Sequence, residues 1–536
     1  IARGVIVMNA VSITNSNLPS YYTEYAEVLS TGNADFNTIK AFADLDEPFA
    51  YTELGNAKRL PELTKGHLVW VPEIEKFAVY KNGRWKTDED FAHFRVIDLL
   101  LENLNAEIAF YAVLVRQLKG MAHEHNAKPV LEEFQRRMKA IRSHMLASQR
   151  KSVITATMDL FKAQPGISVS YKDFDSKGHY LGCTNGIVDL RTGEFIENDP
   201  AYLMMKSTVV AFDAKAECPK FLAFLNEIFQ GDQDKIDYQQ QILGQACIGS
   251  MNKDTLTLEV GDGANGKSVK NDLVMQILGD YAAQVSPDAF MGKTDKPEYV
   301  QANLLNVRFV CMNESERGDK LAGAVVKSCV DSGMVTARHP YGRGFQYQPF
   351  YTPVLLTNFM PYISLDPAVW RRIKVIPFDY TVPKDKRDPN LRKKLFDEEA
   401  AGVLNWMIAG AKRVLEQGKV IVPQSILDIQ DGFRLEFDKV GQFLNECCVE
   451  RTSTKPPEKM KVRITPLRKG YDKWCKDNGY RATSTRDLRA ELEKKGFRIA
   501  KSTGGHEYVY GIEIKDFGDS ISLILPEDES QSLMDL

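Results

Sequence analysis

The sequence predicts an α/β protein whose core lies between an N-terminal region of helices and short strands and a smaller C-terminal unit. Strand-like and helix-like segments alternate from about Thr255 to Phe378, the pattern of an α/β core. Inside that core a glycine-rich stretch falls between a strand-like and a helix-like segment. The length of 536 residues suits three or four domains at roughly 150 residues each.

The region ahead of the core is predicted to be partly strand and partly helix. Residues 1–60 are polar and aromatic with few clear periods, so no element is predicted there. Strands are predicted at Leu68–Val71 and Phe77–Tyr80, before the turn dipeptide Asn82-Gly83. Further predicted elements are helices within 91–161, short strands within 167–215, and helices at Cys218–Phe229 and Asp234–Ile248.

The region behind the core is predicted to begin after one long helix. That helix is expected at Asp388–Gln417, and a Pro-Gln-Ser break at residues 423–425 follows it. The predicted units are residues 1–90, 91–250, 251–422 and 423–515, with an acidic tail at 516–536.

Composition excludes several classes of protein. Charged residues make up 26% and apolar residues 43%, as in ordinary globular proteins, and the formal net charge of −3 excludes a uniformly basic protein. No apolar run approaches the roughly 18 residues of a membrane span, and no secretory signal is seen, so a cytoplasmic protein is expected. Because the first residue is Ile1 and not Met, the chain is expected to be a piece of a longer protein.

Cysteine and histidine spacing gives little support for a structural metal. None of the eight cysteines forms a C-x-x-C pair, so we expect thiols in a reducing compartment. His123 and His125 are the only tight histidine pair, and they lack the spacing of known zinc motifs.

The most specific motif is a complete G-x-x-x-x-G-K-[ST] sequence, which predicts a phosphate-binding loop. Its residues are Gly261, Asp262, Gly263, Ala264, Asn265, Gly266, Lys267 and Ser268. An alternating apolar strand, Leu256–Val260, enters it and a helix-compatible stretch, Val269–Leu278, leaves it. Backbone N–H groups and a helix N-terminus would hold the phosphates of ATP. Lys267 would reach the β- and γ-phosphates, and Ser268 would bind Mg²⁺. The competing interpretation is a glycine-rich turn with a chance lysine.

Two acids follow the next strong apolar strand and are the predicted magnesium and water ligands. The strand begins near Val307 and ends at Glu314 and Glu316. Glu314 is assigned with Ser268 to the metal, and one of the two acids would orient or deprotonate the attacking water. Which acid has which role stays open, and an ordinary acidic loop is the alternative.

Three polar residues further on complete the predicted catalytic set. Asn358 ends another apolar strand, where its amide could bond the γ-phosphate or the water. Arg371 and Arg372 come 13 and 14 residues later. An arginine at a subunit boundary can stabilise charge on a neighbour's nucleotide, although a surface ion pair is the more common role of such a pair.

The order and spacing of these motifs resemble the superfamily 3 helicases, and among them the phage/plasmid primase-helicase family, which is related to the poxvirus-type primase-helicases. Three further stretches resemble segments of that family: Gly83-Arg84-Trp85, residues 180–190, and Leu404-Asn405-Trp406. The likeness covers about residues 66–500, with residues 91–250 matching the helicase-associated domain.

The resemblance implies an AAA+-like core that assembles as a homo-hexamer around one DNA strand and moves 3′ to 5′. It implies that Arg371 or Arg372 acts in trans and that Lys327 also contacts the neighbour's nucleotide. It further implies a hairpin in the central channel, with single-stranded DNA contacts from Arg338, His339, Tyr341 and Arg343. No acidic motif for nucleotide polymerisation is seen in residues 1–165, so a primase module is expected upstream, on another chain, or not at all.

The C-terminal unit is locally basic. Residues 451–500 hold 15 Lys and Arg against six Asp and Glu, a local net charge of +9. Two short helices and a strand pair there predict a winged-helix-like domain for duplex or forked DNA, and a small solvated domain is the alternative. The last six residues, 531–536, weakly resemble a sliding-clamp-binding peptide.

Four functions fit these motifs to different degrees. A replicative helicase, working on single-stranded and forked DNA with other replication proteins and no membrane, is the leading hypothesis. A DNA-translocating ATPase with little unwinding and an origin-binding initiator are alternatives. A small-molecule kinase fits least, because it needs neither Asn358 with Arg371 and Arg372 nor a basic C-terminal unit.

Overall fold

A computed structural model was obtained for the chain. It describes residues 34–47, 49–87, 95–121, 127–250, 254–289, 297–313, 320–330, 333–338, 344–363, 365–450, 460–501 and 505–515. Glu314, Glu316, His123, His125, His339, Tyr341 and Arg343 lie outside these ranges, as do the predicted acidic tail and the clamp-like peptide.

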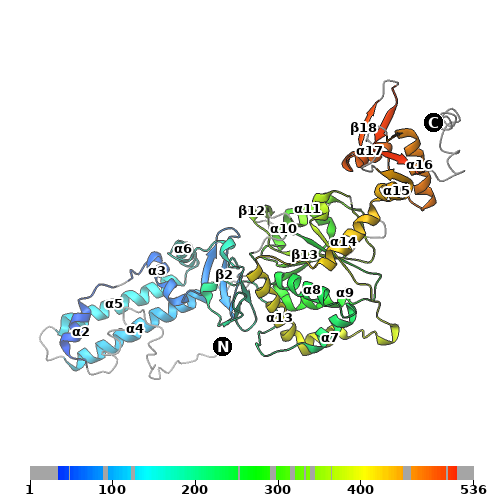
Figure 1. Ribbon diagram of the computed structural model, residues 1–536. Coiled ribbons are helices and arrows are strands. Elements are labelled where there is room, and N and C mark those ends of the chain that lie inside the picture. The colour runs from blue at the N-terminus through cyan, green and yellow to red at the C-terminus, as the bar shows by residue number, and fades with distance from the viewer. Residues whose placement is uncertain are drawn as a thin grey trace, which may run out of the picture.

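The N-terminal unit is a helical arm attached to a small sheet (Figure 1). Its helices are α2 (Phe36–Ala43), α3 (Glu53–Thr64), α4 (Val96–Gly120), α5 (Ala127–Ser148) and α6 (Lys151–Lys162). Strands β1 (Leu68–Val71), β2 (Lys76–Lys81) and β3 (Arg84–Thr87) form an antiparallel sheet in that order. Helices α4 and α5 pack side by side and extend away from the rest of the molecule.

Helices α2 and α3 were not predicted from hydrophobic periodicity. Polar side chains cap their N-termini and link α3 to α4. The Asp35 carboxylate accepts a hydrogen bond from Thr38 N at 2.7 Å and caps α2, and Thr52 caps α3 in the same way. Inside the arm, Arg59 of α3 forms a buried ion pair with Glu107 of α4 and donates to Asn103 at 3.0 Å. These contacts order residues 35–64, for which the hydrophobic pattern is weak.

Short antiparallel strands connect the arm to the core. They are β4 (Tyr180–Gly182), β5 (Ile187–Asp189) and β6 (Phe195–Ile196), between the 3-10 turns η3 (Tyr171–Asp173) and η4 (Pro200–Tyr202). They fall where the sequence predicted short strands.

Five described strands form the parallel sheet of the core in the order β15-β7-β13-β9-β8. They are β7 (Leu256–Val260), β8 (Ala282–Val285), β9 (Phe309–Asn313), β13 (Thr352–Thr357) and β15 (Ile373–Pro377). Strands β7, β13 and β15 are buried along their whole length, so even their polar residues Thr257, Glu259 and Lys374 are enclosed.

Helices cover both faces of this sheet (Figure 1). On one face Val354 and Leu356 of β13 pack in the same cluster as residues of α7 (Pro219–Ile228), α8 (Gln233–Gln245), α9 (Lys267–Leu278) and α13 (Leu391–Gln417). On the other face Leu355 joins residues of α11 (Gly323–Val330) and α14 (Gln424–Phe437). The alternation along β13 is the two-residue period of a strand between two helical layers.

Smaller elements surround the sheet. They are η5 (Gly279–Tyr281), η6 (Pro287–Ala289), α10 (Pro297–Asn303), β10 (Lys320–Leu321), β11 (Val335–Arg338), β12 (Gly344–Tyr347), β14 (Tyr362–Ile363), α12 (Pro367–Trp370) and η7 (Lys384–Lys386). Strands β11 and β12 pair antiparallel, which gives a hairpin where the sequence predicted one.

The C-terminal unit has its own core. It contains α15 (Lys439–Cys447), β16 (Cys448–Glu450), β17 (Lys461–Arg463), α16 (Ile464–Asp477), α17 (Thr485–Lys494), β18 (Arg498–Lys501), β19 (Glu507–Tyr510) and β20 (Ile512–Ile514). Strands β17, β19 and β18 form an antiparallel sheet in that order, and Phe443, Tyr471 and Leu488 share one buried cluster with it.

The parallel sheet is covered in part by helices that lie outside the predicted core of residues 251–422. Helices α7 and α8 precede residue 251, yet they pack on the parallel sheet with α13. Helix α14 follows residue 423, yet its Gln430 donates to the Trp370 carbonyl at 2.8 Å beside β15. The Pro-Gln-Ser stretch is a bend within the core, because α14 buries its apolar side against that sheet.

Replacing Gly410 with alanine should destabilise the core by about 1–3 kcal/mol. A Cβ atom at Gly410 would lie 2.2 Å from the Gln240 carbonyl oxygen, where α13 crosses α8. Gly432→Ala in α14 is the matched control, since its Cβ would meet nothing within 4 Å. The control should be neutral or more stable by up to about 1 kcal/mol. Urea unfolding followed by circular dichroism measures both, and equal midpoints for Gly410→Ala and the native chain would contradict the close crossing.

Candidate functional site

The loop after β7 has a backbone that few residue types can adopt. Gly263, Ala264 and Gly266 have φ angles of +96°, +50° and +86°. A Cβ atom at Gly261 would lie 2.5 Å from the Phe378 carbonyl oxygen, and one at Gly266 would lie 2.8 Å from Ile228. The glycines therefore let the loop turn tightly against the end of β15 and against α7.

The loop is tied to the strands beside it. Val382 N donates to the Ala264 carbonyl at 2.8 Å, and the buried Asn265 amide donates to the Phe378 carbonyl at 3.4 Å. Lys267 is the first residue of α9, is 4% exposed, and bonds the Gly261 carbonyl through Nζ. Ser268 and Asp262 are exposed. The structure thus brings the predicted loop residues around the N-terminus of one helix.

A buried polar cluster lies directly beneath the loop. Glu259 of β7 and Lys270 of α9 form an ion pair in which both side chains are 0% exposed. Gln239 of α8 donates to Glu259 at 3.0 Å and accepts from Lys270 at 2.9 Å. Asn271 donates to Glu259 at 2.7 Å and to the Lys267 carbonyl at 2.9 Å. This cluster joins the strand before the loop to the first turn of the helix after it.

Asn358 lies beside the loop. Gly261 N donates to the Thr357 carbonyl at 3.2 Å, because β13 pairs with β7 along its length. The Thr357 hydroxyl donates to the Phe359 carbonyl at 2.6 Å and shapes the turn that holds Asn358. Asn358 is exposed at this edge.

Strand β9 lies next to β13 on the side away from β7. Asn313, its last residue, pairs with Leu356 and stands just before Glu314 in the sequence. The positions predicted for the two acids therefore follow a strand that ends at the same sheet edge as β7 and β13. The acids themselves lie outside the described residues.

Arg371 and Arg372 are not at this loop. Arg371 and Arg372 directly precede β15, whose first residue, Ile373, pairs with Leu256 at the start of β7. They thus lie at the opposite edge of the sheet, about 16 Å away at roughly 3.3 Å per strand residue. Arg371 is exposed, and Arg372 donates to the Ala368 carbonyl at 2.7 Å. Lys327 is exposed on α11, which contacts α12.

The predicted DNA hairpin is described only at its base. Arg338 ends β11 and is exposed, while His339, Tyr341 and Arg343 at the tip lie outside the described residues. The Phe345 ring of β12 contacts Tyr171 of η3 edge-on, with ring centres 6.3 Å apart. The base of the hairpin therefore packs against the segment that leads from the arm.

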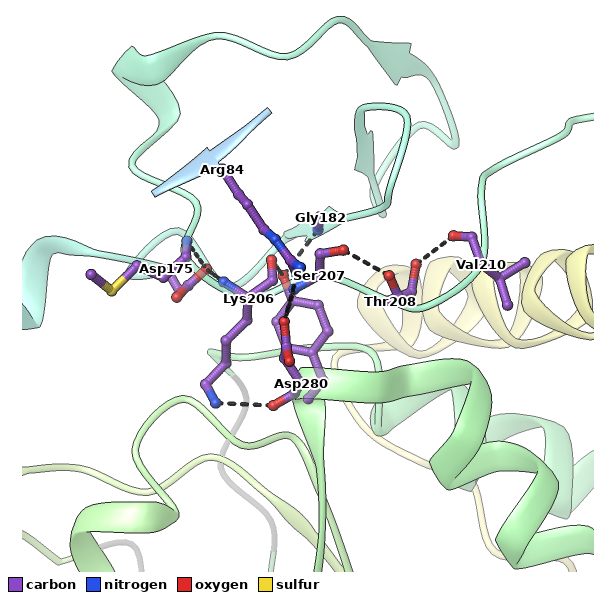
Figure 2. A network of polar contacts seen from close by, with 10 residues as sticks. Arg84, Asp175, Gly182, Lys206, Ser207, Thr208, Val210 and Asp280 are labelled. Atoms are coloured by element: carbon purple, nitrogen blue, oxygen red, sulfur yellow. Dashed lines mark hydrogen bonds and ion pairs between the residues drawn. The ribbon is translucent and has the colours of Figure 1, made fainter. Parts of the chain in front are cut away.

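A polar network joins the N-terminal unit to the far end of α9 (Figure 2). Arg84 of β3 forms an ion pair with Asp280 at 2.8 Å, and Lys206 donates to the Asp280 carbonyl at 2.9 Å. The Tyr281 hydroxyl accepts from Gly182 N at 3.0 Å and donates to the Lys206 carbonyl at 2.9 Å. Sequence reasoning missed these contacts, because each one joins residues that are far apart in the chain.

Strand β9 is anchored to the same network. The Arg308 guanidinium is 1% exposed and donates to the Cys247 carbonyl and, at 2.9 Å, to the Tyr180 carbonyl. It also lies over the Tyr281 ring at 4.3 Å from the ring centre. Strand β9, which leads toward Glu314, therefore begins directly after a buried arginine that is held in place by these contacts.

Asp175 is a buried acid in this network. Its Oδ1 atom accepts from Met205 N at 3.1 Å and from Lys206 N at 3.2 Å. Burial raises the pKa of Asp175 to about 6, against the attraction of Arg308 and Lys206. Burial also lowers the pKa of Lys206.

The described residues offer no preformed metal cluster. Among them, no group of three or more His, Cys, Asp or Glu side chains could hold a metal ion. All eight cysteines are free thiols. No helix within the described ranges is both long and apolar enough to cross a membrane.

Comparison with known proteins gives three kinds of match. A family model described as "D5 N terminal like" matches residues 57–230. A "Putative helicase" of Acanthamoeba polyphaga mimivirus is 24% identical over 513 residues, which are 87% of this chain and 52% of that protein. A "Putative primase" of African swine fever virus is 22% identical over 457 residues, which are 79% of this chain and 46% of that protein.

The chain is similar to proteins named as helicases and primases of large DNA viruses. A "Putative helicase" of Frog virus 3 is 25% identical over 289 residues, 48% of this chain and 29% of that protein. The chain thus spans about half the length of these curated relatives, or less. Among solved structures, the C-terminal region of NrS-1 matches 86% of this chain at 12% identity with a TM-score of 0.47.

Replacing Lys270 with methionine should destabilise the core by about 3–5 kcal/mol, because it leaves the Glu259 carboxylate buried without its partner. Lys393→Met is the matched control, since Lys393 is 75% exposed and pairs with Asp397 on the surface. The control should cost less than about 1 kcal/mol. Adding Glu259→Leu to Lys270→Met should restore part of the loss. Equal stability of the two single variants in urea unfolding would argue against a structural role for the pair.

Asp175→Asn should change how stability depends on pH. The folded-state pKa of about 6 lies above the ordinary 3.8, so the contribution of Asp175 is fully present below pH 3.8 and is lost as the pH rises toward 6. An asparagine can still accept both backbone hydrogen bonds and does not ionise. The stability of the variant relative to the native chain should therefore rise between pH 4 and pH 6, by at most about 3 kcal/mol. Thermal melting at several pH values measures this difference, and parallel curves would be inconsistent with a buried titrating acid.

Proposed function

We propose that the chain is an ATP-dependent DNA helicase, and that it belongs to the superfamily 3 primase-helicases that its motifs resemble. The observation that carries this proposal is the sheet order, in which β13 lies between β7 and β9. That order sets Gly261–Gly266, Asn358 and the positions after Asn313 at the ends of three neighbouring parallel strands. Nucleotide chemistry in α/β proteins takes place at this kind of edge.

ATP with Mg²⁺ is the proposed cofactor, and the loop fits its phosphates. The positive φ angles at Gly263, Ala264 and Gly266 turn the backbone around the N-terminus of α9. A helix N-terminus with free N–H groups favours phosphate oxygens. Lys267 stands in the first turn of that helix, where its ammonium can exchange the Gly261 carbonyl for a phosphate. Ser268, exposed beside it, and Glu314 would hold the magnesium ion.

Hydrolysis needs a residue that positions water and a residue that polarises it. Bound magnesium neutralises charge that develops on the phosphates. We assign Asn358 to binding the γ-phosphate or the attacking water, and Glu314 and Glu316 to the metal and to proton removal. The buried Glu259–Lys270 pair keeps the loop and α9 in register while these groups act.

Arg371 and Arg372 support a ring of subunits. They stand at the sheet edge opposite the loop, so they are poorly placed to reach a nucleotide bound by their own chain. Arg371 and Lys327 are exposed, as a contact to a neighbouring subunit requires. We propose that one of the arginines, with Lys327, reaches the neighbour's nucleotide in a homo-hexamer that moves 3′ to 5′.

DNA would be contacted at two places in this mechanism. The first is the β11–β12 hairpin with Arg338, His339, Tyr341 and Arg343, which we propose to line the channel and follow single-stranded DNA. The second is the C-terminal unit, in which α15, β16, β17, α16, α17, β18 and β19 follow one another, and we propose that it acts as a winged helix. Its local net charge of +9 over residues 451–500 suits duplex or forked DNA.

An origin-binding initiator is the second candidate function. The same basic C-terminal unit favours it, because a sequence-specific domain would also combine helices, a strand pair and positive charge. An initiator would bind one DNA sequence tightly and unwind weakly, whereas a translocating ATPase would move on DNA without separating strands. A primase module and other replication proteins are the proposed partners, since relatives named as helicases and primases match this chain.

Lys267→Ala should lower ATP hydrolysis at least about 100-fold while the fold is kept, because the charge facing the phosphates is lost. Hydrolysis is measured as phosphate release with and without single-stranded DNA. Lys393→Ala, which removes an exposed lysine of α13, should hydrolyse ATP at the native rate. Native activity in Lys267→Ala would reject the loop as the nucleotide site.

Mixing two inactive variants tests the trans role of the arginines. An Arg372→Ala chain has an intact loop, and a Lys267→Ala chain has an intact arginine. If the arginine serves the neighbour's loop, mixtures should regain ATP hydrolysis that neither variant shows alone. The same mixture with Arg371→Ala identifies which arginine acts. An absence of recovery at every ratio for both arginines would contradict the assignment.

A further inference from the structure

The surface of the helical arm carries an unusual block of charge. Residues 134–158 hold six Lys and Arg and no Asp or Glu, in a chain whose formal net charge is −3. The block covers most of α5 and the first half of α6. It lies outside the parallel sheet, the β11–β12 hairpin and the C-terminal unit.

Four cations of this block have exposed charged groups. Lys139 and Arg142 lie on the outer side of α5, and Arg150 and Lys151 stand where α5 ends and α6 begins. Within the described residues, none of the four side chains forms an ion pair or a hydrogen bond. Lys139 and Arg142 are three residues apart on α5, about 4.5 Å along the helix axis, and Arg150 and Lys151 follow shortly after α5 ends at Ser148.

The acids of α5 and α6 are already engaged with other cations. Glu133 holds Arg136 at 2.7 Å and Arg137 at 2.8 Å. Asp159 holds Lys162 at 2.8 Å, and Glu132 lies 4.0 Å from Lys128. The other cations of α5 and α6 are thus paired locally, whereas the four between Lys139 and Lys151 keep their charge for an external partner.

The neighbours of the four cations suit phosphate groups. Ser143, Ser152 and Thr155 are exposed among them and can donate to phosphate oxygens. Leu146 is the single large apolar side chain of described α5 that is exposed. A helix that inserts into a membrane surface needs a broad apolar face, which this one lacks.

We propose that the outer face of α5 and the start of α6, with Lys139, Arg142, Arg150 and Lys151, bind the phosphate backbone of nucleic acid. The contact would be independent of base sequence, because it is made through charge and hydroxyl groups. Helices α4 and α5 extend away from the parallel sheet (Figure 1), so the arm would hold nucleic acid outside the proposed channel. This role goes beyond the proposed helicase function and needs no ATP hydrolysis.

A charge-neutralised arm tests the proposal. The arm variant carries Lys139→Gln, Arg142→Gln, Arg150→Gln and Lys151→Gln, and glutamine keeps a helix propensity similar to that of lysine and arginine. The matched control carries Lys384→Gln, Lys386→Gln, Lys412→Gln and Lys419→Gln. It removes four exposed charges from the surface of the unit that contains the parallel sheet. A charge-keeping variant exchanges lysine and arginine at the four arm positions.

Binding is measured without nucleotide by the anisotropy of fluorescein-labelled single-stranded and duplex DNA over a range of salt. The arm variant should bind duplex about tenfold more weakly or worse at 0.1 M salt, and the magnitude of its log–log salt slope should fall by about 3.6 for four lost contacts. The control and the charge-keeping variant should stay within about twofold of the native chain. Unchanged binding in the arm variant, or an equal loss in the control, would overturn the proposal.

A photocrosslink locates the contact directly. Benzoylphenylalanine at Leu146 should crosslink to DNA, and the same residue at the exposed Leu222 of α7 should not. Sedimentation with phosphatidylserine vesicles tests the membrane alternative. Vesicle binding lost in the arm variant, with DNA binding unchanged, would assign the surface to lipid and reject nucleic acid. Since every measurement lacks ATP, a chain that failed to hydrolyse ATP would still give a clear result.

Discussion

The parallel pairing of β7 with β13 and β15 is the constraint on which the rest of the proposed site depends. Gly261 N bonds the Thr357 carbonyl, and Phe378 N bonds the Val260 carbonyl at 2.7 Å. These two hydrogen bonds continue the backbone pairing one residue past the ends of β7 and β15. The loop, Asn358 and the residues after β15 therefore meet at one edge of the sheet.

Contacts at both ends of α9 support that edge of the sheet. The buried Glu259–Lys270 pair joins β7 to α9, and Asn271 links the same carboxylate to the Lys267 carbonyl. At the far end of α9, Asp280 and Tyr281 contact Arg84 and Lys206 of the N-terminal unit. One helix thus touches the proposed phosphates at its first turn and the N-terminal unit just after its last, so the two regions share a rigid element.

The sequence predicted the parts of the molecule that depend on local rules. The glycine loop was predictable because positive φ angles favour glycine, as at Gly263 and Gly266, and the strands of the core because apolar residues recur along them. The start of the helical arm was missed, since α3 contains Pro61 and many polar residues and has a weak apolar period. The place of α14 in the core was also missed, because Gln430 and Trp370 are 60 residues apart and only the fold brings them together. The partners of Glu259, Asp175 and Arg308 could not be predicted either. A buried charged residue does not show in the sequence which distant residue will pair with it.

Strand separation tests the central proposal most directly. The native chain, with ATP and magnesium, is incubated with a fork that carries a single 3′ tail, and beside it with one that carries a single 5′ tail. A 3′-to-5′ helicase should release the labelled strand from the 3′-tailed fork, and both Lys267→Ala and omission of ATP should stop the release. ATP hydrolysis that is stimulated by DNA but releases no strand from either fork would contradict the helicase and leave a translocase or an initiator.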